Sequence, residues 1–119
     1  MTAMQGLRFV TVTELEALAR QGGPVVVAFV ATWNRRCQGF ADDYLALATR
    51  WAAVLPVVCV DVDESSALTA THDISSVPTL LLIEAGRVVH REVGLALEAI
   101  EARLLSGPGS GSGSGQPLG

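Results

Sequence analysis

Residues 25–39 of the chain read VVVAFVATWNRRCQG, and this stretch decides the fold. Its first half is a run of β-branched and apolar residues without polar alternation, which predicts a central, buried strand over residues 25–31. Asn34 follows as a helix N-cap, because its side-chain oxygen can accept hydrogen bonds from the next backbone N–H groups. Cys37 then stands in the first turn of the helix. The stretch therefore predicts a buried strand, a short turn and a helix N-terminus that carries a sulfur.

The composition is that of one globular domain. The chain has 119 residues, of which 50% are apolar and 17% are charged, enough for one core but not for two. The formal net charge is −4, and the only basic cluster is Arg35-Arg36, so we expect neither a nucleic-acid nor a membrane partner. The longest apolar run is too short to cross a bilayer, and residues 1–10 lack the pattern of a signal peptide. We expect a cytoplasmic monomer.

The cysteine count argues against a disulfide scaffold and against a zinc site. Cys37 and Cys59 are the only cysteines, whereas small secreted scaffolds carry more and structural zinc needs four ligands. His72 and His90 do not supply the missing ligands at a familiar spacing. Three carboxylates stand at the end of the third expected strand and directly after it, namely Asp61, Asp63 and Glu64. They are read as an acidic loop before a helix N-terminus, so we expect no metal and no cofactor.

Hydrophobic periodicity predicts an α/β domain with the element order βαβαβαββα. Strands are expected over residues 8–10, 25–31, 57–62, 79–83 and 88–93, and helices from 13 to about 22, 35 to 54, 65 to 72 and 95 to 105. Crossover helices make the first three strands parallel, and a tight turn at 84–87 makes the last two an antiparallel hairpin. The result is a three-layer α/β/α sandwich with a mixed central sheet.

The helices and the C-terminal segment carry three further expectations. Thr13 and Glu16 are read as the capping box of the first helix. The second helix shows one broad buried face, formed by Phe40, Tyr44, Leu45, Leu47, Ala48, Trp51 and Leu55. Residues 106–119, SGPGSGSGSGQPLG, cannot bury a core. We therefore expect a folded domain over 1–105 and a flexible Gly/Ser-rich tail or linker after it.

Several short motifs together resemble the thioredoxin family over about Phe9 to Leu105. Residues 27–33, VAFVATW, resemble the family's second strand and the tryptophan before its redox motif. Asn34-Arg35-Arg36-Cys37 then occupies the position of the Cys-x-x-Cys motif. Residues 76–80, SVPTL, resemble the loop in which the family has a cis-proline, here Pro78, facing that motif. Two further matches are the hairpin turn at 84–87 and Val93-Gly94 before the last helix.

The resemblance implies a thioredoxin-like fold, thiol–disulfide chemistry and a protein or peptide substrate. It also shows two departures, because Asn34 stands where the family has its attacking cysteine and Ala28 where typical members have a buried aspartate. Cys37 corresponds to the second, resolving cysteine. The helix dipole together with Arg35 and Arg36 favours its thiolate. Cys37 is therefore the candidate catalytic residue, forming mixed disulfides that an outside thiol such as glutathione resolves.

Each of these residues also has a purely structural interpretation. Asn34 either contacts a ligand or the Cys37 sulfur, or it only caps the helix, which we favour. Cys37 is either a reactive monothiol or a buried small hydrophobe. Arg35 and Arg36 either bind an anion, such as glutathione or an acidic partner, or are solvated charges. Cys59 either pairs with Cys37 or is a buried apolar residue of its strand, and we favour the second interpretation.

A peptide groove is the second candidate site. The resemblance places Trp33, Val77, Pro78 and Gly94 around it, and a cis bond at Pro78 would expose the Val77 backbone to an extended peptide. Trp33 either contacts that peptide or only packs. Two functions follow from these alternatives. One is a thioredoxin-like protein of thiol–disulfide redox homeostasis, impaired or with the single active-site cysteine Cys37. The other is a redox-inactive binding module, a chaperone or adaptor.

Overall fold

The computed structural model describes residues 4, 6–64, 74, 76–94, 97–106 and, by their backbone, 116–117. The elements are α1 (Val12–Arg20), β1 (Val25–Val30), α2 (Arg35–Trp51), β2 (Val57–Asp61), β3 (Thr79–Glu84), β4 (Arg87–Val93), α4 (Leu97–Ser106) and β5 (Gln116–Pro117). Strands β1 to β4 begin and end within one residue of the predicted bounds. The helix expected over 65–72 lies outside the described residues.

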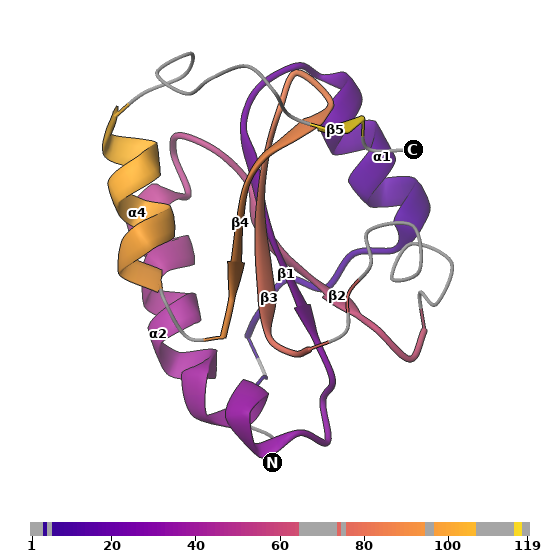
Figure 1. Cartoon of the computed structure of the whole chain (residues 1–119), viewed down its shortest axis with the longest axis vertical. Helices are drawn as coiled ribbons and strands as arrows, with labels where there is room; N and C mark the ends of the chain where they lie inside the picture. The colour runs from indigo at the N-terminus through magenta and orange to yellow at the C-terminus, as the bar shows by residue number, and fades with distance from the viewer. Residues whose placement is uncertain are drawn as a thin grey trace.

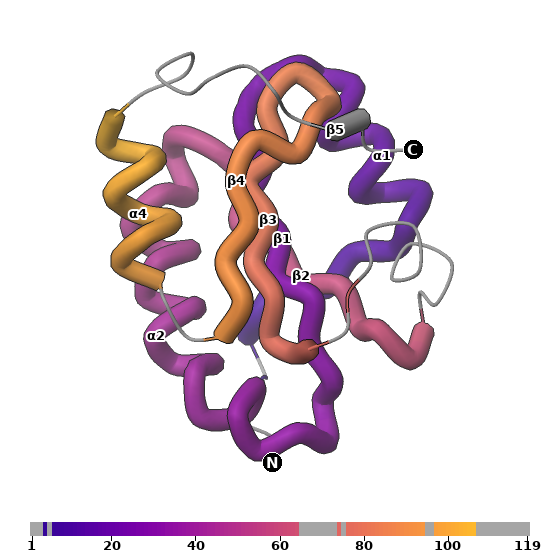
Figure 2. Tube along the Cα trace, viewed as in Figure 1, coloured from indigo at the N-terminus to yellow at the C-terminus, as the bar shows by residue number. Residues whose placement is uncertain are grey.

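The sheet is mixed, as predicted, with the strand order β2-β1-β3-β4-β5. Strand β1 runs parallel to β2 and antiparallel to β3, and β3 and β4 form the antiparallel hairpin. The segment expected as a first strand over 8–10 joins β2 by a single parallel bridge between Phe9 and Cys59. Helices α2 and α4 cover one face of the sheet and α1 covers the other (Figure 1, Figure 2). The predicted α/β/α sandwich is therefore confirmed.

The central strand β1 contributes to both hydrophobic cores. Val26, Ala28 and Val30 belong to the cluster beneath α2 and α4. The alternate residues of the strand face α1 and belong to the second cluster, namely Val25, Val27 and Phe29. All six residues of β1 are buried. This explains why the strand has no polar alternation in its sequence, since neither of its faces meets water.

The first helix begins earlier than predicted. Thr11 is the N-cap: its hydroxyl oxygen accepts from the Glu14 N–H at 3.1 Å, and the Glu14 carboxylate accepts from the Thr11 N–H at 2.8 Å. The capping box predicted at Thr13 and Glu16 is therefore wrong. The Thr-x-x-Glu pattern occurs twice, two residues apart. The earlier start also brings Val12 into the helix, where it packs against the α1-side core.

Helix α2 is shorter than predicted, and its buried face is narrower. It ends at Trp51 rather than Val54, which is exposed. The side chain of Leu45 is 36% exposed, so its assignment to the buried face is wrong. Leu45 follows Tyr44, and one residue of an α-helix turns by about 100°, which carries its side chain off the buried stripe. The other six residues of the predicted face are buried or pack against the cluster.

The last hairpin and the chain end complete the sheet. The turn between β3 and β4 has Ala85 at φ 53° and Gly86 at φ 76°, the pair of positive φ angles of a two-residue type I′ turn. Gln116 and Pro117 pair with Val88 and Arg87 on the outer edge of β4. The sequence did not predict this pairing.

No described helix is long and apolar enough to cross a membrane.

Candidate functional site at the start of helix α2

Three chain segments meet at one end of the sheet. Strand β1 ends there and leads through residues 31–34 into α2. Strand β3 begins there, because Thr79 pairs with Phe29 near the end of β1. Strand β4 ends there, because Val93 pairs with Thr79. The start of α2, the start of β3 and the end of β4 therefore lie at the same end of the molecule (Figure 1).

The predicted groove residues of the β3 and β4 ends lie together. The peptide bond between Val77 and Pro78 is cis. The N–H of Gly94 donates to the carbonyl oxygen of Pro78 at 2.8 Å, and Gly94 has a positive φ of 95°. Pro78 is buried and Val77 is half-buried, and Val77 packs against the hydrophobic cluster that contains Cys37.

Asn34 caps helix α2. Its Oδ1 accepts from the backbone N–H of Arg36 at 2.9 Å and of Cys37 at 3.2 Å. Two of the helix's unpaired donors are thereby satisfied, which is what an N-cap side chain supplies. The side chain of Gln38 closes the turn from the other side, since its Nε2 donates to the carbonyl oxygen of Thr32 at 2.9 Å. These side-chain hydrogen bonds of Asn34 and Gln38 fix the first turn of α2.

Cys37 lies under this turn rather than on its surface. Its exposed fraction is 0%. Burial raises the pKa of the Cys37 thiol, and hydrogen bonding with the backbone of Ala31 acts less strongly in the opposite direction. The sequence predicts that the helix dipole, Arg35 and Arg36 favour the thiolate and so lower the pKa of Cys37. The pKa is raised instead. Both arginine side chains are exposed, so water screens their charges, whereas the sulfur bears the cost of leaving water.

Cys59 is buried on β2, as favoured from the sequence. Its exposed fraction is 0%, and both cysteines are free thiols. Burial and the negative charge of a Cys37 thiolate raise the pKa of Cys59 to about 12. Tyr44 lies in the same cluster and donates its hydroxyl to the carbonyl oxygen of Val58 at 2.6 Å. Burial, above all, raises the pKa of that hydroxyl.

Trp33 is the exposed aromatic residue of the site. Its side chain is 68% exposed, and its Nε1 donates to Oδ2 of Asp63 at 2.8 Å. The sequence does not predict this bond, because an acidic loop before a helix N-terminus accounts for Asp63 equally well. The signal was present in the strand directions, since the parallel pairing of Val30 with Asp61 brings the residues after β1 and β2 to one edge. The backbone N–H of Asp63 donates in turn to Oδ1 of Asp61 at 2.9 Å.

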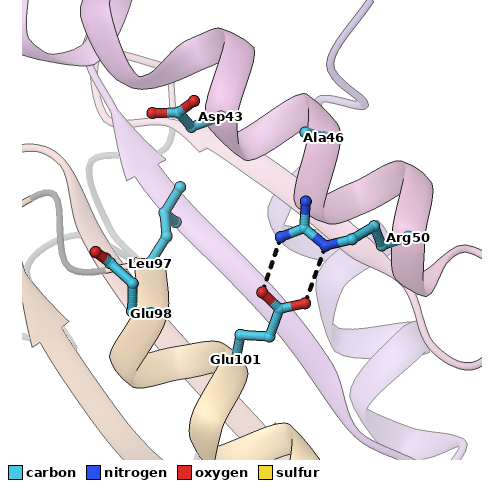
Figure 3. A pocket seen from close by; sticks show the side chains of 6 residues that line it. All are labelled: Asp43, Ala46, Arg50, Leu97, Glu98 and Glu101. Carbon is cyan, nitrogen blue, oxygen red and sulfur yellow. Dashed lines mark hydrogen bonds and ion pairs between the residues drawn. The ribbon is translucent and has the colours of Figure 1, made fainter.

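Described residues also line two surface hollows, the second of which includes Asp61. One of about 260 Å³ lies between α2 and α4 (Figure 3) and is lined by Asp43, Ala46, Arg50, Leu97, Glu98 and Glu101. Another of about 370 Å³ lies beside the start of α1, lined by Phe9, Val10, Thr11, Val12, Thr13, Asp61 and Glu64. Neither contains a residue of the predicted site. Within the described part of the chain, no three His, Cys, Asp or Glu residues are grouped to hold a metal ion.

Known proteins share this architecture. The family model described as Thioredoxin matches residues 8–105. The chain is 36% identical over 80 residues to the thioredoxin-like protein slr0233 of Synechocystis sp., covering 67% of this chain and 76% of that protein. It is 37% identical over 83 residues to thioredoxin of Mycobacterium tuberculosis, covering 70% and 72%. Mitochondrial thioredoxin 3 of Saccharomyces cerevisiae superposes with a TM-score of 0.77 at 24% identity, covering 88% and 99%. The chain belongs to the thioredoxin family.

Proposed function

We propose that the chain serves thiol–disulfide redox homeostasis in the cytoplasm as a monomer with one active-site cysteine, Cys37. The observation that supports this role is the place of that sulfur. It lies in the first turn of α2, three residues after the N-cap Asn34, at the end of the sheet that also carries the exposed Trp33 and the bonded pair of Pro78 and Gly94. Its substrate would be a protein or peptide disulfide.

The proposed reaction consists of three thiol–disulfide exchanges. The Cys37 thiolate attacks one sulfur of the substrate disulfide, the other sulfur leaves as a thiolate and takes a proton, and a mixed disulfide remains. An outside thiol such as glutathione then attacks the Cys37 sulfur and releases the second substrate thiol. A second glutathione attacks the resulting Cys37–glutathione disulfide, which frees Cys37 and leaves oxidised glutathione. Because burial raises the pKa of Cys37, little thiolate is present at neutral pH and the first turn of α2 has to open. Turnover should therefore be slow.

Variants at position 34 test this proposal. Asn34→Cys supplies the missing first cysteine of the motif, and we expect it to reduce insulin disulfides much faster than the wild-type chain. Asn34→Ser is the matched control, since serine also caps a helix well but brings no thiol. Cys37→Ser should remove the residual activity. The proposal fails if Cys37 in the folded wild-type chain does not react with a mild alkylating agent over hours at pH 8.

A redox-inactive peptide-binding module, of the chaperone or adaptor class, is the second candidate function. The observation that favours it is the full burial of Cys37 beneath a surface on which Trp33 stays exposed. Such a module would hold an extended peptide between Trp33 and the Val77-Pro78 loop, with Arg35 and Arg36 beside it for acidic side chains. Reduced insulin B chain is a suitable probe. Binding that survives Cys37→Ser and is lost in Trp33→Ala supports the module, and the opposite pattern discards it.

A further inference from the structure

The two cysteines of the chain lie in one buried cluster beneath α2. Cys37, Ala28 and Cys59 all belong to that cluster. Ala28 and Cys59 are register partners on the neighbouring parallel strands β1 and β2, so their side chains point to the same face of the sheet. That face is the one covered by α2 (Figure 2). Because Ala28 carries only a methyl group, no large side chain of β1 stands beside Cys59 on this face.

Tyr44 links helix α2 to strand β2 next to Cys59. Its hydroxyl donates to the carbonyl oxygen of Val58, the residue that directly precedes Cys59. Tyr44 follows Cys37 by seven residues, which places both on the same stripe of the helix, and both are buried in the same cluster. A negative charge on Cys37 also raises the pKa of Cys59. Both thiols are therefore buried in the same hydrophobic cluster.

We propose that Cys59 is the internal resolving thiol of this site, closing a Cys37–Cys59 disulfide in place of a pair within the motif. The inference rests on the proposed function of Cys37 as the residue that forms mixed disulfides. It assigns Cys59 a chemical role instead of the packing role that its strand position suggests. The chain would then be a dithiol protein whose two thiols come from a helix and a strand.

The reaction balances as follows. Cys37 thiolate attacks a disulfide RSSR, which gives Cys37–S–S–R and an RS⁻ ion that takes a proton. Cys59 loses its proton to solvent, and its thiolate attacks the Cys37 sulfur and expels the second RS⁻, which is also protonated. Two cysteine thiols are oxidised by two electrons, and one substrate disulfide becomes two thiols. A low-molecular-weight thiol or a dithiol reductase returns the protein to its reduced form.

Oxidised glutathione and tryptic mass mapping test this inference on the full chain. The chain has no lysine, so cleavage after Arg36, Arg50 and Arg87 places Cys37 in the peptide 37–50 and Cys59 in the peptide 51–87. Samples taken over time at pH 8 are quenched in acid and digested without reduction. In the wild-type chain we expect a transient glutathione adduct on 37–50, followed by disulfide-linked 37–50 and 51–87. In Cys59→Ala the adduct should persist, with a lifetime longer by on the order of tenfold or more, because an intramolecular attack is removed.

Two matched variants separate loss of the thiol from loss of packing. Val60→Ala removes side-chain volume from the next position of β2, which faces the opposite core, and keeps both sulfurs, so it should resolve the adduct like the wild type. Cys59→Val keeps an apolar, β-branched residue suited to a strand and should behave like Cys59→Ala. Equal adduct lifetimes in wild type and both Cys59 variants, or linkage only in unfolded protein, overturn the inference while leaving the proposed function intact. No adduct at Cys37 in any variant overturns both.

Discussion

At the scale of single residues, desolvation decides the state of both sulfurs. Cys37 has the helix N-terminus and two arginines beside it in sequence, all of which favour a thiolate. Its side chain is nevertheless fully buried, and burial is the largest contribution to its raised pKa. The charges near Cys37 can be read from the sequence. The burial cannot, because it depends on residues from distant segments, such as Val77, that pack against the same cluster.

Cys59 should make the protein less stable in alkali. In the unfolded chain the thiol titrates near its ordinary pKa of 9.0, whereas in the folded chain its pKa is about 12. Between these values the folded state holds more protons than the unfolded state, so the free energy of unfolding falls as pH rises, by up to about 1.4 kcal/mol per pH unit. Urea unfolding at a series of pH values from 8 to 11 measures this fall. Cys59→Ala should show a shallower fall, and equal slopes would contradict the prediction.

At the scale of the elements, Glu101 joins α4 to α2. Its carboxylate accepts from Arg50 Nη2 at 2.8 Å and Nε at 3.0 Å, drawn as dashed lines in Figure 3. It also accepts from Trp51 Nε1 at 2.7 Å. The hydrogen bonds from Arg50 and then Trp51 are the main causes that lower the pKa of Glu101. The contact holds the last helix against the helix that carries Cys37.

Glu101→Gln should reduce the acid-dependent part of the stability. A carboxyl group whose pKa is lower in the folded chain stabilises the fold above its unfolded pKa, here near 4.5, and this contribution disappears as pH falls through the folded pKa. The wild-type melting temperature should therefore exceed that of Glu101→Gln by a few degrees at pH 7, and the difference should shrink below about pH 4. Glu98→Gln removes the same charge from the preceding turn of α4 and serves as the control. A difference independent of pH would refute this account.

Much of the element pattern could be predicted from local sequence. Strands β1 and β2 stand out as continuous apolar runs. The β3–β4 hairpin stands out as an apolar run and a mixed polar and apolar run on either side of a turn with Gly86. The exact start of α1 could not be predicted, because two overlapping Thr-x-x-Glu patterns are locally equivalent and the packing of Val12 distinguishes them. The bond between Trp33 and Asp63 depends on the register of β1 against β2, which the predicted parallel direction of the strands does not fix.

At the scale of the whole molecule, the family resemblance gives the fold more securely than it gives the chemistry. Motifs spread from residue 9 to 105 all depend on one arrangement of strands and helices, and the matched region covers residues 8–105. Chemistry depends on fewer positions. Asn34 caps the start of α2 and carries no thiol, so a residue at this position can preserve the scaffold without determining the reaction.

Removal of the residues after Ser106 should leave the fold intact. Within the described residues, the segment contributes only the backbone pairing of Gln116 and Pro117 with β4, whereas both hydrophobic clusters are formed before residue 105. The urea midpoint of the truncated chain should match that of the full chain closely. The uncovered edge of β4 should make the truncated chain more prone to self-association, which sedimentation over a range of concentrations detects. A large loss of stability would show that the tail belongs to the folded domain.

The indole of Trp33, which is bonded to Asp63, is a built-in fluorescent reporter of the site. The chain has two tryptophans: the indole of Trp33 is largely exposed at the start of α2, and that of Trp51 is held by Glu101 at the other end of the same helix. A ligand that covers Trp33 should shift its fluorescence emission to shorter wavelength, while Trp51 provides a nearly constant background. Events at the sulfur-bearing end can therefore be followed in real time without an attached dye.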